Sequence, residues 1–282
     1  MKHISAMTAM RDRTNSWRSK LRQLPSLLLG LILSVALFSC ATAPETGRQQ
    51  LLLVSPSDEA RLGVQTFQQL KEQQKVVTRG QDLAMLQRVG ERISQVAPVP
   101  NARWEFVLFE DEAPNAFALP GGKVGVNTGI LPITQDEAGL ATVIGHEIAH
   151  VVARHGAERM SHRLLVELGG AGLSAALGAE AGANRNLIMQ AYGVGTQLGV
   201  MLPYSRTQEL EADQLGLLFM ARAGYDPRAA AAFWNRFATY NARRGGPMLE
   251  FLSTHPLDQR RIAELERSMP QAVAEHERTR AR

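Results

Sequence analysis

The pentapeptide HEIAH at residues 146–150 constrains this chain more than any other feature of its sequence. It matches H-E-x-x-H, in which two histidines one helical turn apart present both imidazoles to one metal ion. His146 and His150 are therefore candidate zinc ligands, and Glu147 is placed to take a proton from a zinc-bound water. A pattern of three fixed residues occurs by chance in roughly one in a hundred chains of this length, so the surrounding sequence has to decide.

The residues around the motif predict one long helix from Thr134 to about Leu165. Thr134 and Glu137 have the spacing of a capping box, and Pro132 lies just before the predicted start. Apolar residues follow at mostly helical spacing: Ala138, Ala141, Ile144, Ile148 and Val151. The motif thus falls inside a helix, which is what metal binding by both histidines requires.

A catalytic zinc usually takes three protein ligands and keeps one position for water, so a third ligand is needed. The segment SRTQELEADQLG at 205–216 has a helical pattern in which Glu209 and Asp213 share one face. This favours Glu209 as the third ligand and Asp213 as the acceptor of a hydrogen bond from a ligand imidazole. Glu211 is the alternative ligand, about 200° round the helix from Glu209 and unable to share that face with Asp213.

Four segments in this order resemble the HtpX-like, CaaX-prenyl-protease-like and Oma-type zinc metallopeptidases: NAFALPGGKVGVNTGIL, HEIAH, ELEAD and THPLDQRR. The resemblance covers about residues 57–265, and the layout is most similar to compact lipoprotein peptidases of the periplasm. It implies an α+β, predominantly helical, zincin-like fold with a small β-sheet beside the HExxH helix. It also implies one Zn²⁺ per chain, bound by His146, His150 and Glu209, with Glu147 as the general base.

A substrate-binding strand is expected next to the motif helix. The alternating segment RWEFVLF at 103–109 predicts one strand, and Pro120-Gly121-Gly122 predicts a turn between two more. In zinc peptidases of this kind a strand edge binds extended substrate through backbone groups. The candidate edge is Asn115, Ala116, Phe117, Ala118 and Leu119; an ordinary structural hairpin is a compatible alternative.

The resemblance also implies a role for His255, in THPLDQRR. In a periplasmic relative the matching histidine can bind the zinc and hold the enzyme inactive. His255 is therefore a candidate fourth ligand and switch, since a neutral imidazole can displace the catalytic water. A loop histidine without this role is the alternative.

The N-terminus predicts export. Six basic residues precede an apolar run of fifteen residues, Leu24 to Phe38, which is short for a membrane span and typical of a signal-peptide core. Leu37-Phe38-Ser39-Cys40 resembles a bacterial lipobox, and Cys40 is the only cysteine, so a lipid anchor is expected there. An uncleaved N-terminal anchor is the alternative. Ala41 then implies, by resemblance, the periplasmic side of the outer membrane.

Four regions follow. Residues 1–39 are a predicted lipoprotein signal peptide, 40–56 a lipidated cysteine and tether, 57–270 the metallopeptidase domain, and 271–282 a charged tail predicted to be disordered. Residues 57–97 and 229–240 are expected to be helical. The uncharged stretch within 164–202 predicts two helices packed against the protease core or a flap over the cleft, rather than a second membrane span.

The charge balance excludes one class of partner. Residues 1–39 hold six of the 31 basic and one of the 27 acidic residues, which leaves 25 and 26 in the remainder. The high pI is therefore due mainly to the targeting segment and gives no support for nucleic-acid binding.

The expected activity is zinc-dependent endopeptidase cleavage of misfolded or unassembled cell-envelope proteins. The resemblance also leaves room for a partner in outer-membrane assembly. The alternative function is a zinc-bound chaperone or assembly factor with little proteolysis, because His255 on the zinc would keep the site inactive.

Overall fold

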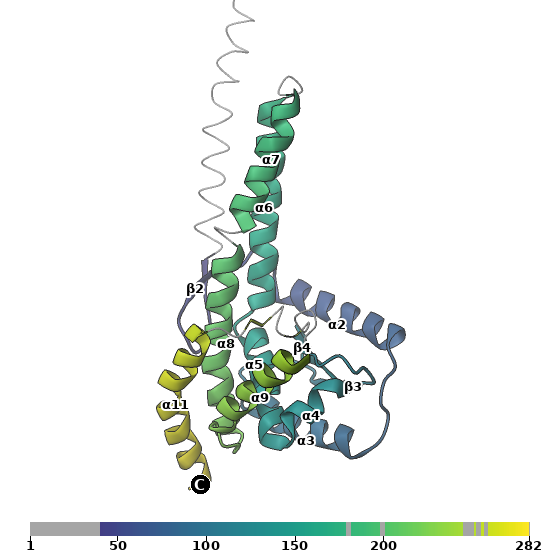
Figure 1. Cartoon of the computed structure of the whole chain (residues 1–282), viewed down its shortest axis with the longest axis vertical. Helices are drawn as coiled ribbons and strands as arrows, with labels where there is room; N and C mark the ends of the chain where they lie inside the picture. Colours follow the sequence, from purple (N-terminus) through teal and green to yellow (C-terminus); the bar gives the residue numbers. More distant parts are fainter. Residues whose placement is uncertain are drawn as a thin grey trace, which may run out of the picture.

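A computed structural model describes residues 40–178, 182–197, 201–244, 251, 255–256 and 259–281. The predicted signal peptide, residues 1–39, lies outside the described residues, so cleavage and lipidation at Cys40 stay predictions. The fold is predominantly helical with two small sheets, and this confirms the expected fold class (Figure 1). None of the helices in these ranges combines the length and the apolar character that crossing a membrane requires.

The sheet beside the motif helix has three strands: β3 (Glu105–Phe109), β4 (Ala116–Leu119) and β5 (Lys123–Asn127). Their order is β3-β5-β4, with β5 parallel to β3 and antiparallel to β4. The turn between β4 and β5 contains Gly121 and Gly122, both with positive φ, which confirms the predicted turn. β5 is buried along its whole length, and β4 lies at an edge of the sheet.

Two helices precede this sheet, α2 (Pro56–Gln73) and α3 (Gln81–Val96). Ser55 caps α2 through a hydrogen bond from Asp58 N, and Pro56 occupies the first turn, where its missing N–H costs nothing. The helical prediction for 57–97 is confirmed, with a break at 74–80.

The motif helix differs from the prediction at both ends. Thr134 closes the short helix α4 (Leu131–Thr134), and α5 (Glu137–Val152) is capped by Asp136, which accepts a hydrogen bond from Gly139 N at 2.8 Å. The predicted capping box is therefore wrong, because Asp136 provides the cap. The predicted single helix is also wrong: Arg154 adopts a left-handed conformation and separates α5 from α6 (His155–Leu177).

The break after α5 is held by tertiary contacts of Arg154. Its Nε donates to Glu59 of α2 at 2.8 Å, and its Nη2 donates to Val54 O at 3.0 Å. These bonds tie the turn after α5 to α2 and to the residue before its cap. They are formed between residues about a hundred positions apart, which local periodicity cannot show.

The helices after α6 build the other side of the molecule. α7 (Gly182–Thr196) packs along α6, and the two project from the body as an arm instead of covering the core (Figure 1). α8 (Leu202–Arg222) packs against α5, α9 (Ala229–Arg244) crosses α5, and α11 (Gln259–Arg280) lies along α8. The arm exposes several apolar side chains: Leu164, Leu165, Leu168, Leu187, Ile188 and Val194.

Two expectations about the ends of the domain are corrected. The tail 271–282 is helical as far as Arg280, because α11 continues across residue 270 and buries Ala272 and His276. Arg282 lies outside the described residues. The segment expected to be a tether contains the strands β1 (Cys40–Thr42) and β2 (Gln49–Leu51), paired antiparallel in a hairpin.

Candidate functional site

The close packing of α5 on α8 decides which residues meet. A Cβ on Gly216 of α8 would lie 3.0 Å from His146 N, and a Cβ on Gly145 of α5 would lie 3.0 Å from Gly216 O. The two glycines let the helix backbones approach closely, at the usual cost of glycine within a helix. This contact brings the Glu209–Asp213 face of α8 onto the HEIAH face of α5. Sequence reasoning missed both glycines, although glycine inside a predicted helix was a visible signal.

We expect Gly216→Ala to destabilise the fold by about 1–3 kcal/mol, because the added methyl group would press on the backbone of Gly145 and His146 and overpack the helix contact. Zinc binding should weaken with it, since Glu209 is carried on the displaced helix. Thermal unfolding and zinc titration of the purified protein measure the two effects. Gly172→Ala in α6 is the matched control: its Cβ would meet nothing within 4 Å, so it should be neutral or slightly stabilising.

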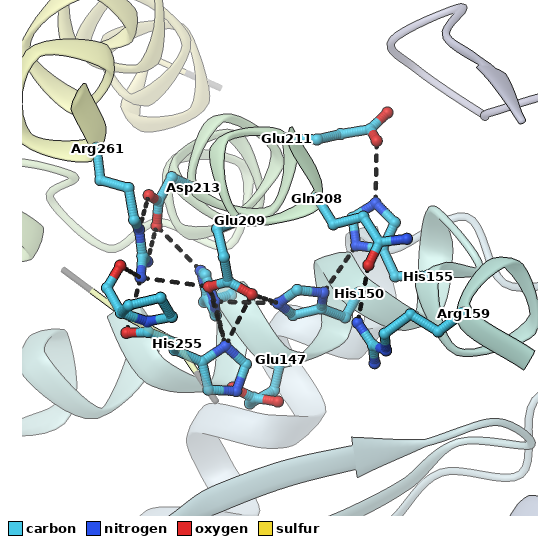
Figure 2. A network of polar contacts seen from close by, with 12 residues as sticks. Glu147, His150, His155, Arg159, Gln208, Glu209, Glu211, Asp213, His255 and Arg261 are labelled. Carbon is cyan, nitrogen blue, oxygen red and sulfur yellow. Dashed lines mark hydrogen bonds and ion pairs between the residues drawn. The ribbon is translucent and has the colours of Figure 1, made fainter. Parts of the chain in front are cut away.

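Four side chains converge at this contact: His146, His150, Glu209 and His255 (Figure 2). One potential ligand atom from each lies within 4.8 Å of the others. His146 Nε2 is 3.1 Å from His150 Nε2, 3.2 Å from Glu209 Oε2 and 3.2 Å from His255 Nδ1. The structure therefore brings together the three predicted ligands and the predicted switch residue.

These atoms fit a zinc ion. Tetrahedral ligands at zinc bond lengths of about 2.0–2.1 Å are separated by roughly 3.3 Å, close to the distances between the nitrogen and oxygen atoms here. The Nε2 atoms of His146 and His150 face each other at 3.1 Å, a spacing that one shared zinc ion satisfies. The donor set of imidazoles and one carboxylate is a zinc set.

Asp213 takes the predicted outer position. Its Oδ1 lies 3.0 Å from His146 Nδ1, so the ring is oriented with Nε2 toward the other ligands. Burial acts to lower the pKa of His146, but Asp213 and Glu209 outweigh it and raise that pKa to about 9. Zinc binding would therefore displace a proton from His146.

Arg261, which sequence reasoning missed, holds this side of the site. Its Nε and Nη2 donate to Asp213 at 2.7 Å each, and its Nη1 lies 3.2 Å from Glu209 Oε2. Nη1 also donates to the backbone oxygens of His255 and Pro256 at 3.1 and 3.3 Å. One guanidinium thus ties the segment carrying His255 to Glu209 and Asp213 of α8. The signal was the double arginine of THPLDQRR. These two residues lie in the first turn of α11.

Glu147 lies among these groups without a hydrogen bond to its Oε1, and His255 Nε2 is 3.5 Å away. The side chain is almost fully buried, and burial raises the pKa of the Glu147 carboxyl. A buried carboxylate with a raised pKa and a free oxygen is suited to accept a proton from a water molecule beside it.

Glu211, the alternative ligand, points to the other side of α8. It accepts a hydrogen bond from His155 Nε2 at 2.9 Å (Figure 2). It also accepts one from Arg48 Nε at 2.6 Å. The structure thus places Glu209, and not Glu211, beside the two motif histidines.

The predicted substrate edge lies next to α5 as β4. In the described part of the chain β4 pairs with β5 on one side only, which leaves the backbone of its other side without a strand. The side chain of Phe117 is part of an aromatic cluster, 6.3 Å from Phe67 and 6.0 Å from Phe109 between ring centroids. That side chain therefore anchors α2 on the sheet, and any pairing with substrate involves the β4 backbone.

Comparison with known proteins agrees with this geometry. Residues 81–269 match the sequence pattern of Peptidase family M48. The chain belongs to this family. M48 metallopeptidases use zinc, and His146, His150 and Glu209 converge here at the spacing of zinc ligands.

Several M48 relatives are similar over most of this chain. It is 40% identical over 190 residues to the mitochondrial metalloendopeptidase OMA1 of Schizosaccharomyces pombe, covering 67% of this chain and 54% of that protein. The OMA1 of Saccharomyces cerevisiae is 34% identical over 247 residues, 82% of this chain and 69% of the relative. The beta-barrel assembly-enhancing protease of Escherichia coli is 27% identical over 245 residues, 85% and 49%. The chain thus spans about half the length of the first and third of these.

These relatives correct the predicted location. A lipid-anchored protein on the periplasmic side of the outer membrane was expected, but the first relatives, in yeasts, plant and mammals, are mitochondrial. The beta-barrel assembly-enhancing proteases are more distant. The prediction depended on residues 1–40, which carry none of the M48 site, so site and location were separate inferences. The layout of a compact periplasmic lipoprotein peptidase stays a prediction.

Proposed function

We propose that this protein is a zinc-dependent endopeptidase that cleaves unfolded or unassembled proteins. The observation that carries the proposal is the convergence of His146, His150 and Glu209 at zinc-ligand spacing, with the buried Glu147 beside them. The names of relatives add support, since they are metalloendopeptidases and an assembly-enhancing protease. A role in the assembly of other proteins would follow the latter relative.

Each residue has one task in this reaction. His146, His150 and Glu209 would hold the ion, and Asp213 and Arg261 would keep His146 and Glu209 in place. Bound zinc would lower the pKa of its water and polarise the scissile carbonyl. Glu147 would take the proton of that water on its free Oε1 and pass it to the leaving amine.

The substrate would lie along β4 in an extended form. Backbone pairing with residues 115–119 selects for a segment that can become a strand and does not depend on its side chains. A folded domain offers few such segments, whereas an unfolded chain offers many. This is the physical reason for proposing unfolded substrates.

The proposal is tested by incubating the zinc-loaded chain with a reduced, unfolded protein and with the same protein folded. Cleavage of the unfolded form alone, abolished by a chelator and restored by zinc, is the expected result. If neither form is cleaved by wild type or by His255→Ala, endopeptidase activity is excluded. Suppression of aggregation that persists in Glu147→Gln would then favour the zinc-bound chaperone.

His255 lies beside both glutamates of the site, since its Nδ1 is 3.0 Å from Glu209 Oε2 and its Nε2 faces Glu147. Proteolysis in the proposed mechanism needs that position for water, so His255 has to move away. We therefore expect His255→Ala to raise the cleavage rate at least about threefold, because a larger fraction of molecules is competent. Initial rates at equal zinc content measure it. An unchanged or lower rate would show that His255 does not block the reaction.

A further inference from the structure

The outer contacts of the two motif histidines differ. His146 faces a carboxylate directly, at 3.0 Å from Asp213. His150 instead faces a second imidazole, since its Nδ1 lies 2.7 Å from His155 Nδ1, and His155 Nε2 lies 2.9 Å from Glu211 Oε2. The sequence analysis assigned no role to His155. The reaction derived above assigns it none either.

Zinc binding would set the direction of each hydrogen bond in the series from His150 through His155 to Glu211. A His150 that binds zinc through Nε2 keeps its proton on Nδ1 and donates it. His155 Nδ1 must then accept, which places the His155 proton on Nε2, where it is donated to the Glu211 carboxylate. The direction is set at both ends, because the carboxylate can only accept and the zinc-bound ring can only donate.

The far end of this chain of bonds is held by the β1–β2 hairpin. Arg48, beside β2, donates from Nε to Glu211 at 2.6 Å, and from Nη1 and Nη2 to Glu158 at 2.7 and 2.8 Å. Thr46 of the same hairpin also donates to Glu211. His155 and Glu158 are fully buried, and Glu211 is 6% exposed. One arginine, from a segment outside the region matched by the family pattern, thus bridges two buried carboxylates.

We propose that the β1–β2 hairpin is a working part of the zinc site, in which Arg48 fixes Glu211, Glu211 fixes His155, and His155 holds the His150 ring with Nε2 toward the ion. His155, Glu211 and Arg48 are positioning residues. The inference relies on the zinc site of the proposed function and does not require that any particular substrate is cleaved. It makes zinc affinity depend on whether Arg48 of the hairpin is docked on α6 and α8.

Zinc affinity of the full-length chain, measured by competition with a chromophoric chelator, tests the proposal without reference to proteolysis. Loss of an outer contact to a zinc ligand costs roughly 10–100-fold in affinity. Arg48→Ala and His155→Leu should each weaken zinc by that amount. His155→Gln should stay within about threefold of wild type, because its amide oxygen can accept from His150 while its NH₂ donates to Glu211.

Glu45→Gln is the matched control for the hairpin. Glu45 pairs with Arg222 at 3.2 Å and both side chains are partly exposed, so this change removes a weak ion pair from the same hairpin and leaves Arg48 and Glu211 docked. Zinc affinity should not change. Wild-type affinity in folded Arg48→Ala would overturn the proposal, and so would equal losses in His155→Gln and His155→Leu.

A double variant adds a second test. If Arg48 and His155 act through one chain of bonds, Arg48→Ala combined with His155→Leu should weaken zinc no more than the larger single change. If the double variant instead lost zinc affinity by the product of the two single losses, the two residues would act independently and the proposal would be overturned. Should Arg48→Ala fail to fold, the two His155 variants still decide. A protein that binds zinc as expected but cleaves nothing would refute the proposed function and leave this inference intact.

Discussion

Replacing Glu147 by glutamine is expected to abolish cleavage of an unfolded protein while leaving bound zinc in place. The amide has the shape of the carboxylate but cannot take a proton from water, and general-base catalysis contributes roughly 10²–10⁴-fold in rate. Glu147 lies beside the proposed zinc ligands but is not one of them, so the zinc content of the purified variant should equal that of wild type. Single-turnover cleavage and metal analysis of the same sample measure the two quantities.

Glu137→Gln is the matched control for this experiment. Glu137 lies in the first turn of the same helix, α5, where it pairs with Arg88 on the surface. The same chemical change there should leave the cleavage rate within about twofold, since surface pairs contribute little to stability. Cleavage by Glu147→Gln at a rate close to wild type would mean that another group takes the proton.

Replacing Glu209 by glutamine is expected to remove zinc and, with it, all activity. The carboxylate lies 3.2 Å from His146 Nε2 and 3.4 Å from His150 Nε2, so it is the one anionic member of the ligand set. Burial acts to raise the pKa of Glu209, but the surrounding histidines outweigh it and hold that pKa well below the usual range. The loss should exceed the roughly hundredfold upper range for an outer contact, because a direct ligand is lost.

Glu211→Gln provides the comparison on the opposite face of the same helix. Its amide oxygen can still accept from His155 Nε2, so zinc affinity should fall less than tenfold. Equilibrium dialysis against zinc at constant pH measures both variants. A larger loss for Glu211→Gln than for Glu209→Gln would reverse the ligand assignment and restore the alternative that the sequence left open.

The candidate site could be predicted from the sequence because its chemistry repeats with the helical period. His146 and His150 are four residues apart, as are Glu209 and Asp213, and each pair must share a helix face whatever the tertiary structure. The strands and the turn at 121–122 were predicted for a similar reason, since alternation and paired glycines are local signals.

Three of the structural predictions that failed concern the ends of helices. Thr134 had the capping spacing, yet Asp136 caps the motif helix. The continuous helix was broken at Arg154, whose guanidinium binds Glu59 and Val54 from the start of the domain. The C-terminal segment looked like a solvated tail, yet it buries Ala272 and His276 against the body. In the last two cases a contact distant in sequence outweighs a weak local preference, whereas the cap was decided locally, by the hydrogen bond from Gly139 N to Asp136.

By itself, the sequence determined which chemistry to expect of this protein: the type of metal, two histidines and a base on one helix, and a carboxylate ligand, with two candidates, on another. Local spacing suffices for that, because a helix places its own side chains. Only the tertiary structure decided how the two faces meet through Gly145 and Gly216, that Glu209 and not Glu211 joins the histidines, and that Arg261 and Arg48 support the site from opposite ends of the chain. Those contacts depend on packing between distant segments, and one sequence carries no local record of which segments pack together.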